Sequence, residues 1–235
     1  MILNTEAQAP VITIDGPSGA GKGTLSRLVA QHLGYQLLDS GALYRLTALA
    51  AHTANTPIED EHAVASEARH LDADFDVRGS NTRILLAGEE VSQAIRTEAV
   101  SMAASQIAAY PAVRAALLDR QREFRQLPGL VADGRDMGTA VFPDAGVKIF
   151  LTASPEARAE RRYLQLLEAG ETPDKQALAE DIRERDKRDS ERSVAPLKPA
   201  DDAYTLDSTE LSINQVLEAI LEQVGRRQEP NQLHQ

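Results

Sequence analysis

The stretch VITIDGPSGAGKGT, residues 11–24, decides the fold of this chain. Four β-favouring residues lead into a glycine-rich turn, and a helical pattern of apolar residues follows from Leu25 to Leu33. Strand, glycine-rich loop and helix in this order are typical of a P-loop. The glycines allow consecutive backbone N–H groups to turn toward one anion, and the N-terminus of the helix adds positive charge. With the Lys22 ammonium beside them, these groups predict a site for the phosphates of a nucleoside triphosphate.

The composition narrows the class of protein. The 235 residues allow a large core, in one domain or in one domain with an insert. A net charge of −11 disfavours nucleic acid and anionic membranes as main partners. The absence of cysteine excludes disulfides and thiolate sites. The first ten residues do not resemble a signal peptide, and no apolar run of about 18 residues occurs. We therefore expect a cytoplasmic protein without a membrane partner.

Strand and helix patterns alternate along most of the chain. The helices are marked by apolar residues at helical spacing and by capping residues, and prolines 111 and 155 fit the first turns of two of them. The five predicted strands lie at 11–14, 35–38, 130–132, 147–151 and 203–207. Such alternation implies an α/β fold, here a P-loop NTPase-type five-stranded parallel sheet flanked by helices on both faces.

The pattern changes between residues 67 and 105. Short β-prone runs at 75–77 and 83–86 are joined by a turn that contains glycine, serine and asparagine. This arrangement predicts a small antiparallel-β meander. We therefore predict an inserted subdomain at 67–105, within a core formed by residues 1–66 and 106–235.

Charged residues follow the predicted strands at two further places. Ligands of parallel sheets gather beyond the carboxyl ends of the strands, a rule that selects Asp39–Arg45 and Asp133–Asp136. The Asp and Ser that open the first segment could cap a helix as well as contact a ligand. Arg45 favours a bound anion, because a cation near the N-terminus of a helix is otherwise unfavourable. For Arg135, an internal salt bridge with a neighbouring aspartate is the alternative to ligand binding.

A basic face is predicted on a helix in the C-terminal half. Four residues share one side of it: Arg185, Arg188, Asp189 and Arg192. A solvated face with ion pairs is the usual explanation of such a run, whereas the forked geometry of arginine also suits phosphate oxygens. Arg158, Arg161 and Arg162 form a second, less decisive basic stripe. The five histidines lack metal-ligand spacing, so we expect them at the surface.

Together these segments closely resemble the bacterial cytidylate kinases, in the nucleoside monophosphate kinase family. The resemblance covers nearly the whole length and rests on IDGPSGAGKGT (14–24), LDSGALYR (38–45), DGRDMGT (133–139), KIFL (148–151) and RDKRD (185–189). The ending GKGT is typical of monophosphate kinases in general, whereas GRDMGT together with the last segment is far more specific. The insert at 67–105 resembles the enlarged monophosphate-binding subdomain of these enzymes, and residues 155–190 resemble their lid region.

The resemblance implies transfer of the γ-phosphoryl group of ATP to CMP or dCMP, with Mg²⁺, giving CDP or dCDP and ADP. It implies ATP contacts from Gly16, Pro17, Ser18, Gly19, Ala20, Gly21, Lys22, Gly23, Thr24 and Arg161. The acceptor phosphate would be held by Arg45, Arg135 and Arg192, cytosine by Ser105, Arg114 and Asp136, and the ribose by Arg185 and Asp189, with Ser40 beside the acceptor. Lys22, Arg135 and Arg192 are the expected catalytic residues. The resemblance also implies a monomer.

The chemistry of such a transfer agrees with this residue set. The acceptor is a phosphate oxygen that is already largely ionised at pH 7, so no general base is required. Catalysis then consists of aligning two phosphates and neutralising their charge. Lys22 is followed by Gly23, where a Ser or Thr usually ligates Mg²⁺. We therefore predict a metal held mostly by phosphates and water, with no direct protein ligand and with Asp133 assisting through water.

A preference for CMP over UMP follows from the role given to Asp136. A carboxylate can accept a hydrogen bond from the exocyclic amine of cytosine, whereas UMP presents an oxygen at that place. Two facing acceptors cost binding free energy, so UMP is expected to be a poor substrate.

Three alternatives stay open at this stage: a P-loop kinase acting on UMP, dTMP, AMP or shikimate, a P-loop GTPase switch, and a nucleotide-binding scaffold without catalysis. The long insert and the arginine stripe argue against shikimate, and the cluster at Asp136 favours cytosine. A D-x-x-G match at 76–79 lies in the meander, and the Asn-Lys-x-Asp motif for guanine is absent from the sequence. ADP release with each acceptor would discriminate among them.

Overall fold

The computed structural model describes residues 8–76, 83–168 and 170–228. The chain forms two compact units, Met1–Leu38 with Arg122–Gln235, and Asp39–Gln121. The insert predicted at 67–105 lies within the span of the second unit, and its boundaries remain a proposal.

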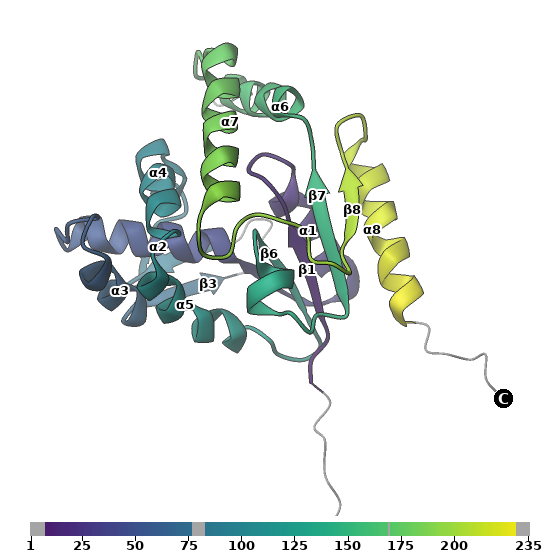
Figure 1. Cartoon of the computed structure of the whole chain (residues 1–235), viewed down its shortest axis with the longest axis horizontal. Helices are drawn as coiled ribbons and strands as arrows, with labels where there is room; N and C mark the ends of the chain where they lie inside the picture. Colours follow the sequence, from purple (N-terminus) through teal and green to yellow (C-terminus); the bar gives the residue numbers. More distant parts are fainter. Residues whose placement is uncertain (1–7, 77–82, 169, 229–235) are drawn as a thin grey trace, which may run out of the picture. The chain divides into compact units, whose positions relative to one another are not determined.

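A five-stranded sheet forms the centre of the first unit, in the order β2-β6-β1-β7-β8. Its strands are β1 (Val11–Asp15), β2 (Gln36–Asp39), β6 (Leu130–Gly134), β7 (Val147–Thr152) and β8 (Tyr204–Asp207). β1 pairs in parallel with β6 and β7, and β7 pairs in parallel with β8 (Figure 1). The five-stranded parallel sheet and the P-loop type of α/β fold predicted from the sequence are confirmed.

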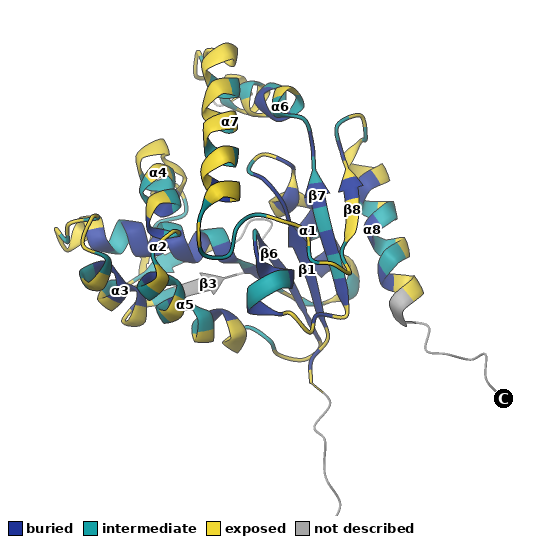
Figure 2. Ribbon diagram, in the orientation of Figure 1, coloured by how far each residue is buried: buried dark blue, intermediate teal, exposed yellow. Residues whose placement is uncertain are grey.

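Four helices of the first unit are α1 (Lys22–Leu33), α6 (Pro155–Glu168), α7 (Lys175–Glu191) and α8 (Ile213–Gln228). Every residue of β1 and β6 is buried (Figure 2). The apolar faces of α1 and α8 pack into the same core, with Val29 and Ile220 fully buried against the central strands. By contrast α7, which packs against α6, is exposed over most of its surface (Figure 2). Burial of the sheet therefore stabilises this unit, while α7 is held by polar contacts.

The second unit consists of helices and a three-stranded sheet in the order β3-β4-β5. Its elements are α2 (Ser40–Thr53), α3 (Glu61–Arg69), β3 (Ala73–Asp76), β4 (Arg83–Leu86), β5 (Glu89–Glu90), α4 (Glu98–Ile107) and α5 (Pro111–Glu123), with a 3₁₀ turn at Ala94–Arg96. Both strand pairs are antiparallel, which agrees with the predicted meander. The turn between the first two strands, and residues 77–79 of the D-x-x-G match, lie outside the described residues.

Helix starts follow the local capping chemistry. The Asp39 side chain accepts a hydrogen bond from the backbone N–H of Ala42 at 2.9 Å and so caps α2. Pro111 and Pro155 stand at the first positions of α5 and α6, where their missing N–H groups are not needed. None of the helices in the described ranges has the length and apolar character required to cross a bilayer.

Candidate active site

The phosphate loop connects β1 to α1 and depends on glycine geometry. Gly16 has φ of +151°, and a Cβ built on it would lie 1.9 Å from the carbonyl oxygen of Leu151. Any side chain at this position would therefore collide with the backbone of β7. The loop can pass this close to the sheet only because residue 16 is glycine.

The carbonyl groups of the loop are held by three cationic side chains. Lys22 Nζ donates to the Pro17 carbonyl at 2.8 Å, Arg158 Nη1 to the Ser18 carbonyl at 2.9 Å, and Arg161 Nη1 to the Ala20 carbonyl at 3.5 Å. Because a trans peptide unit points its C=O and N–H in opposite directions, holding these carbonyls also directs the N–H groups that follow them. The α1 helix that follows has no acidic residue in its first turn, so its positive end is left for an anion.

Lys22 lies buried at the base of the loop. Burial, assisted by Arg135 and Arg185, lowers the pKa of its ammonium to about 8, and Asp133 and Asp15 oppose the shift. An arriving phosphate would add negative charge and favour the protonated lysine. The buried Lys22 ammonium would therefore be stabilised by an anionic ligand such as a phosphate.

Asp15, at the end of β1, received no role from the sequence. Its two carboxylate oxygens accept hydrogen bonds from the backbone N–H groups of Met137 and Gly138, both at 2.8 Å. Burial raises the pKa of Asp15 to about 7, against the opposing effect of these two hydrogen bonds. The contact fixes the segment after β6, which turns through a short π-helical stretch at Met137–Val141. An acidic residue closing an apolar strand was the only signal available in the sequence.

The segment after β6 and the end of α7 bring predicted site residues together. Arg135 donates through Nε to the carboxylate of Asp189, and Arg192 Nη2 lies 3.9 Å from Asp136 Oδ1. Burial alone would raise the pKa of Asp189, but the charge and hydrogen bond of Arg135, with Arg185 and Arg192 nearby, lower it overall. Arg135 thus forms a salt bridge with an aspartate 54 positions along the chain, a partner that was not considered from the sequence.

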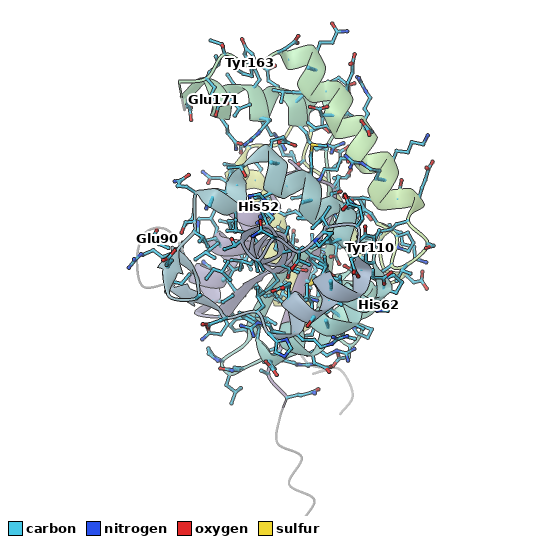
Figure 3. The ribbon with its side chains drawn as sticks, turned by 90° about the vertical axis from the view of Figure 1, so that its left-hand side faces the viewer. His52, His62, Glu90, Tyr110, Tyr163 and Glu171 are labelled. Carbon is cyan, nitrogen blue, oxygen red and sulfur yellow. The ribbon has the colours of Figure 1, made fainter. Side chains whose placement is uncertain are left out.

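Asp133 faces the loop from the end of β6. It is buried, and a Cβ built on Gly23 would lie 3.6 Å from its Oδ2 atom. In the described residues no group of three or more His, Cys, Asp and Glu side chains could hold a metal. The described histidines are exposed, among them His52 and His62, which Figure 3 labels on the second unit.

The predicted acceptor residues of the second unit are held by contacts within that unit. Ser40 Oγ donates to Gln121 Oε1 at 2.6 Å, and both side chains are buried. Arg45 Nη2 donates to Asp39 Oδ2 at 2.9 Å. The same Asp39 carboxylate caps α2, so the capping role is confirmed and the acid also orients the arginine. Gln121 and the Asp39–Arg45 pair are contacts that sequence reasoning missed.

Three polar atoms of this unit are buried without a hydrogen-bond partner among the described residues: Arg45 Nε, Ser105 Oγ and Arg120 Nε. A buried donor without a partner costs free energy, so such atoms mark places where a ligand can supply the missing contact. Arg114 Nη1 lies 3.4 Å from Tyr44 Oη and 3.5 Å from the carbonyl of Ala108. These two contacts orient Arg114.

Comparison with known proteins gives one family. The family model described as "Cytidylate kinase" matches residues 12–226. A curated cytidylate kinase of Pseudomonas paraeruginosa is 62% identical over 219 residues, which cover 92% of this chain and 95% of that protein. The cytidylate kinase of Pseudomonas fluorescens is 59% identical over 221 residues, covering 93% of this chain and 96% of the relative. Among solved structures, a shikimate kinase from Acinetobacter baumannii covers 94% of this chain and 96% of its own at 16% identity, with a TM-score of 0.46.

The low similarity to the shikimate kinase carries no argument about function, whereas the family match does. It spans the phosphate loop, the segment after β6 and α7, where the predicted residues lie. The resemblance found in the motifs is confirmed, and the kinase interpretation prevails over the GTPase switch and the scaffold. The chain therefore belongs to the cytidylate kinase family.

Proposed function

We propose that this protein transfers the γ-phosphoryl group of ATP to CMP or dCMP, forming CDP or dCDP and ADP. The family match supports the reaction. The observation that carries the chemistry is the phosphate loop, where the buried Lys22 stands at the positive end of α1. The reaction belongs to pyrimidine nucleotide metabolism, and a monomer acting in the cytoplasm is part of the proposal.

On the donor side, the proposed ligand is the triphosphate of ATP. The N–H groups of the loop, residues 16–24, hold its β- and γ-phosphates, and Lys22 leaves the Pro17 carbonyl to neutralise them. Arg161 serves ATP from α6. Its guanidinium donates to the carbonyl of Ser208 and, at 3.2 Å, to the Ser208 hydroxyl, so it is anchored beside the loop.

The residues proposed for CMP or dCMP are described unit by unit. In the first unit, Arg135 and Arg192 neutralise the acceptor phosphate, Asp136 accepts from the cytosine amine, and Arg185 with Asp189 bind the ribose. In the second unit, Arg45 holds phosphate, Ser105 and Arg114 donate to cytosine, and Ser40 lies beside the acceptor. The unpartnered Nε of Arg45 and Oγ of Ser105 support the assignments in the second unit, because both atoms require a hydrogen-bond partner.

Proton transfer does not limit this reaction. The attacking oxygen belongs to an ionised phosphate, so no side chain has to remove a proton. The chain contributes alignment of the two phosphates and neutralisation of their charge, through Lys22, Arg135 and Arg192. These three are the proposed catalytic residues.

The residues present fit Mg²⁺ held mostly by phosphate oxygens and water. Gly23 leaves an open space beside the buried Asp133 carboxylate, where the hydroxyl of the more usual Ser or Thr would stand. Asp133 would orient a water ligand of the ion, with no direct protein ligand. When bound, Mg²⁺ would neutralise charge on the transferred phosphoryl group.

An assay of ADP release tests this function. The protein is incubated with ATP, Mg²⁺ and, in parallel, CMP, dCMP, UMP, AMP, dTMP or shikimate. Release with CMP and dCMP alone is the expected result. Release with another acceptor at equal or higher kcat/KM would overturn the substrate assignment, and no release with any acceptor would contradict the reaction itself.

A further inference from the structure

Arg158 on α6 is almost fully buried, which is unusual for an arginine. Its guanidinium donates to the carbonyl of Ala153 at 3.0 Å, to the carbonyl of Ser18 at 2.9 Å, and through Nη1 and Nη2 to both carboxylate oxygens of Asp186 on α7. One side chain thus contacts the phosphate loop, the connection between β7 and α6, and the neighbouring helix α7. Buried charges are costly unless they are paired and hydrogen-bonded in this way.

The phosphate loop packs against the aliphatic part of the Arg158 side chain at Gly19. A Cβ built on Gly19 would lie 3.3 Å from Cβ of Arg158, and Gly19 has φ of +79°. The hydrogen bond to the Ser18 carbonyl fixes the peptide unit between Ser18 and Gly19. Because that unit is planar and trans, the N–H of Gly19 is then directed away from Arg158. Arg158 therefore orients one of the N–H groups that face the phosphates.

Asp186, the ion-pair partner of Arg158, lies on α7. Asp186 follows Arg185 and stands one turn before Asp189, which is itself tied to Arg135 after β6. The exposed helix α7 is therefore fixed at two places, by Arg158 toward the loop and by Arg135 toward the end of β6. Both ion pairs are largely buried, so water weakens them little.

We propose that Arg158 is a positioning residue that joins the phosphate loop to α7 through Asp186. It holds the Ser18–Gly19 peptide in the phosphate-binding orientation, and it holds Arg185 and Asp189 in the orientation for the acceptor. Neither Arg158 nor Asp186 needs to contact a nucleotide for this role. The acceptor half of the inference rests on the proposed function, whereas the donor half rests only on ATP binding at the loop.

The variant Asp186→Asn tests the connection with the smallest change. It removes the charge that pairs with Arg158 but leaves Arg158 its bonds to Ala153 and Ser18. We expect kcat/KM for ATP to fall roughly 10- to 100-fold, with a rise in KM for CMP as well, because both sets of groups lose their alignment. Calorimetry with ATP alone should show weaker binding, a readout that does not depend on the acceptor.

The matched control is Glu156→Gln. Glu156 pairs with Arg183 at 2.5 Å across the same two helices, but this pair is exposed and does not reach the loop. The same change from carboxylate to amide should leave both KM values and kcat within about twofold, as expected for a surface ion pair. A merely structural role for the helix pair would instead give equal effects in the two variants.

Arg158→Lys provides a second test if Asp186→Asn folds poorly. The lysine keeps the charge and can reach Ser18 or Asp186, but it cannot contact both as the guanidinium does. We expect folded protein with ATP affinity reduced about tenfold. Wild-type ATP affinity and wild-type KM for CMP in either folded variant would overturn the inference. Failure of the wild-type protein to phosphorylate CMP would contradict the proposed function and leave the ATP-binding result interpretable.

Discussion

The phosphate loop and the segment after β6 are both parts of the first unit, yet they reach their geometry by different means. The backbone path of the loop depends mainly on residues within it, its glycines and Lys22, which contacts a carbonyl five positions away, and Arg158 and Arg161 add contacts from 140 and 141 positions along the chain. The segment after β6 is shaped by Asp15, 122 positions before Met137, and by Asp189, 54 positions after Arg135. A local sequence motif can specify the first kind of site, whereas the second exists only when the sheet and α7 are assembled.

The largest expected effect comes from removing the positive charge of Lys22 at the phosphate loop. Lys22→Met retains most of the side-chain volume in a buried place and removes the ammonium that neutralises the transferred phosphoryl group. We expect kcat/KM for ATP to fall about 1,000-fold while thermal stability is maintained, since a buried charge is lost. Steady-state kinetics and calorimetric unfolding measure the two effects. A loss of activity below tenfold would contradict the role of Lys22.

Changing the base-reading carboxylate is the second test, directed at the segment after β6. Asp136→Ala should reduce the ratio of kcat/KM for CMP over UMP by roughly 10- to 100-fold. Asp136→Asn is the informative partner, because its amide can donate to the oxygen that UMP presents, and it should shift the preference toward UMP. An unchanged ratio in both variants would refute the assignment of Asp136 to cytosine.

The third prediction concerns the contact between Asp15 and the backbone after β6, which should make the stability of the protein depend on pH. Because the pKa is raised to about 7, the folded protein binds this proton more tightly than the unfolded chain. The contribution to stability is therefore complete below pH 4 and is lost as the pH rises through 7. Urea unfolding should show the wild type losing stability relative to Asp15→Asn between pH 5 and 8.

The same Asp15→Asn variant also loses one of two backbone hydrogen bonds, at a cost of about 1–3 kcal/mol in the free energy of unfolding. An activity loss near tenfold should accompany it, through the displaced Arg135 and Asp136. Parallel stability curves for the two proteins across this pH range would show that Asp15 does not titrate as described.

The smallest expected effect concerns the Mg²⁺ dependence of activity, through Gly23 after the phosphate loop and Asp133 near the end of β6. Gly23→Ser places a hydroxyl in the open space near Asp133 Oδ2, at an ordinary contact distance. We expect the Mg²⁺ concentration for half-maximal activity to fall severalfold, because a direct ligand replaces water. Asp133→Asn should raise it. Mg²⁺ titrations at fixed ATP that leave both variants unchanged would exclude this part of the chain from metal binding.

The sequence predicted the architecture well for reasons that are visible in individual elements. The helix at Pro155–Glu168 and the strand at Val147–Thr152 were expected within a residue, because proline placement and a continuous apolar run are strong local signals. The π-helical stretch at Met137–Val141 was not expected. It depends on two N–H groups donating to Asp15, and no local periodicity records such a contact.

By itself the sequence determined the phosphate loop, the alternation of strands and helices, and the family, because glycine geometry, apolar periodicity and motif spacing are local properties. The tertiary structure alone decided which partners the charged residues take. It paired Arg135 with Asp189 and Arg158 with Asp186, and it brought the Asp15 carboxylate within hydrogen-bond distance of the backbone N–H groups after β6. Such pairings depend on which buried charges meet when helices and sheet pack, since each must find a partner to offset its loss of water.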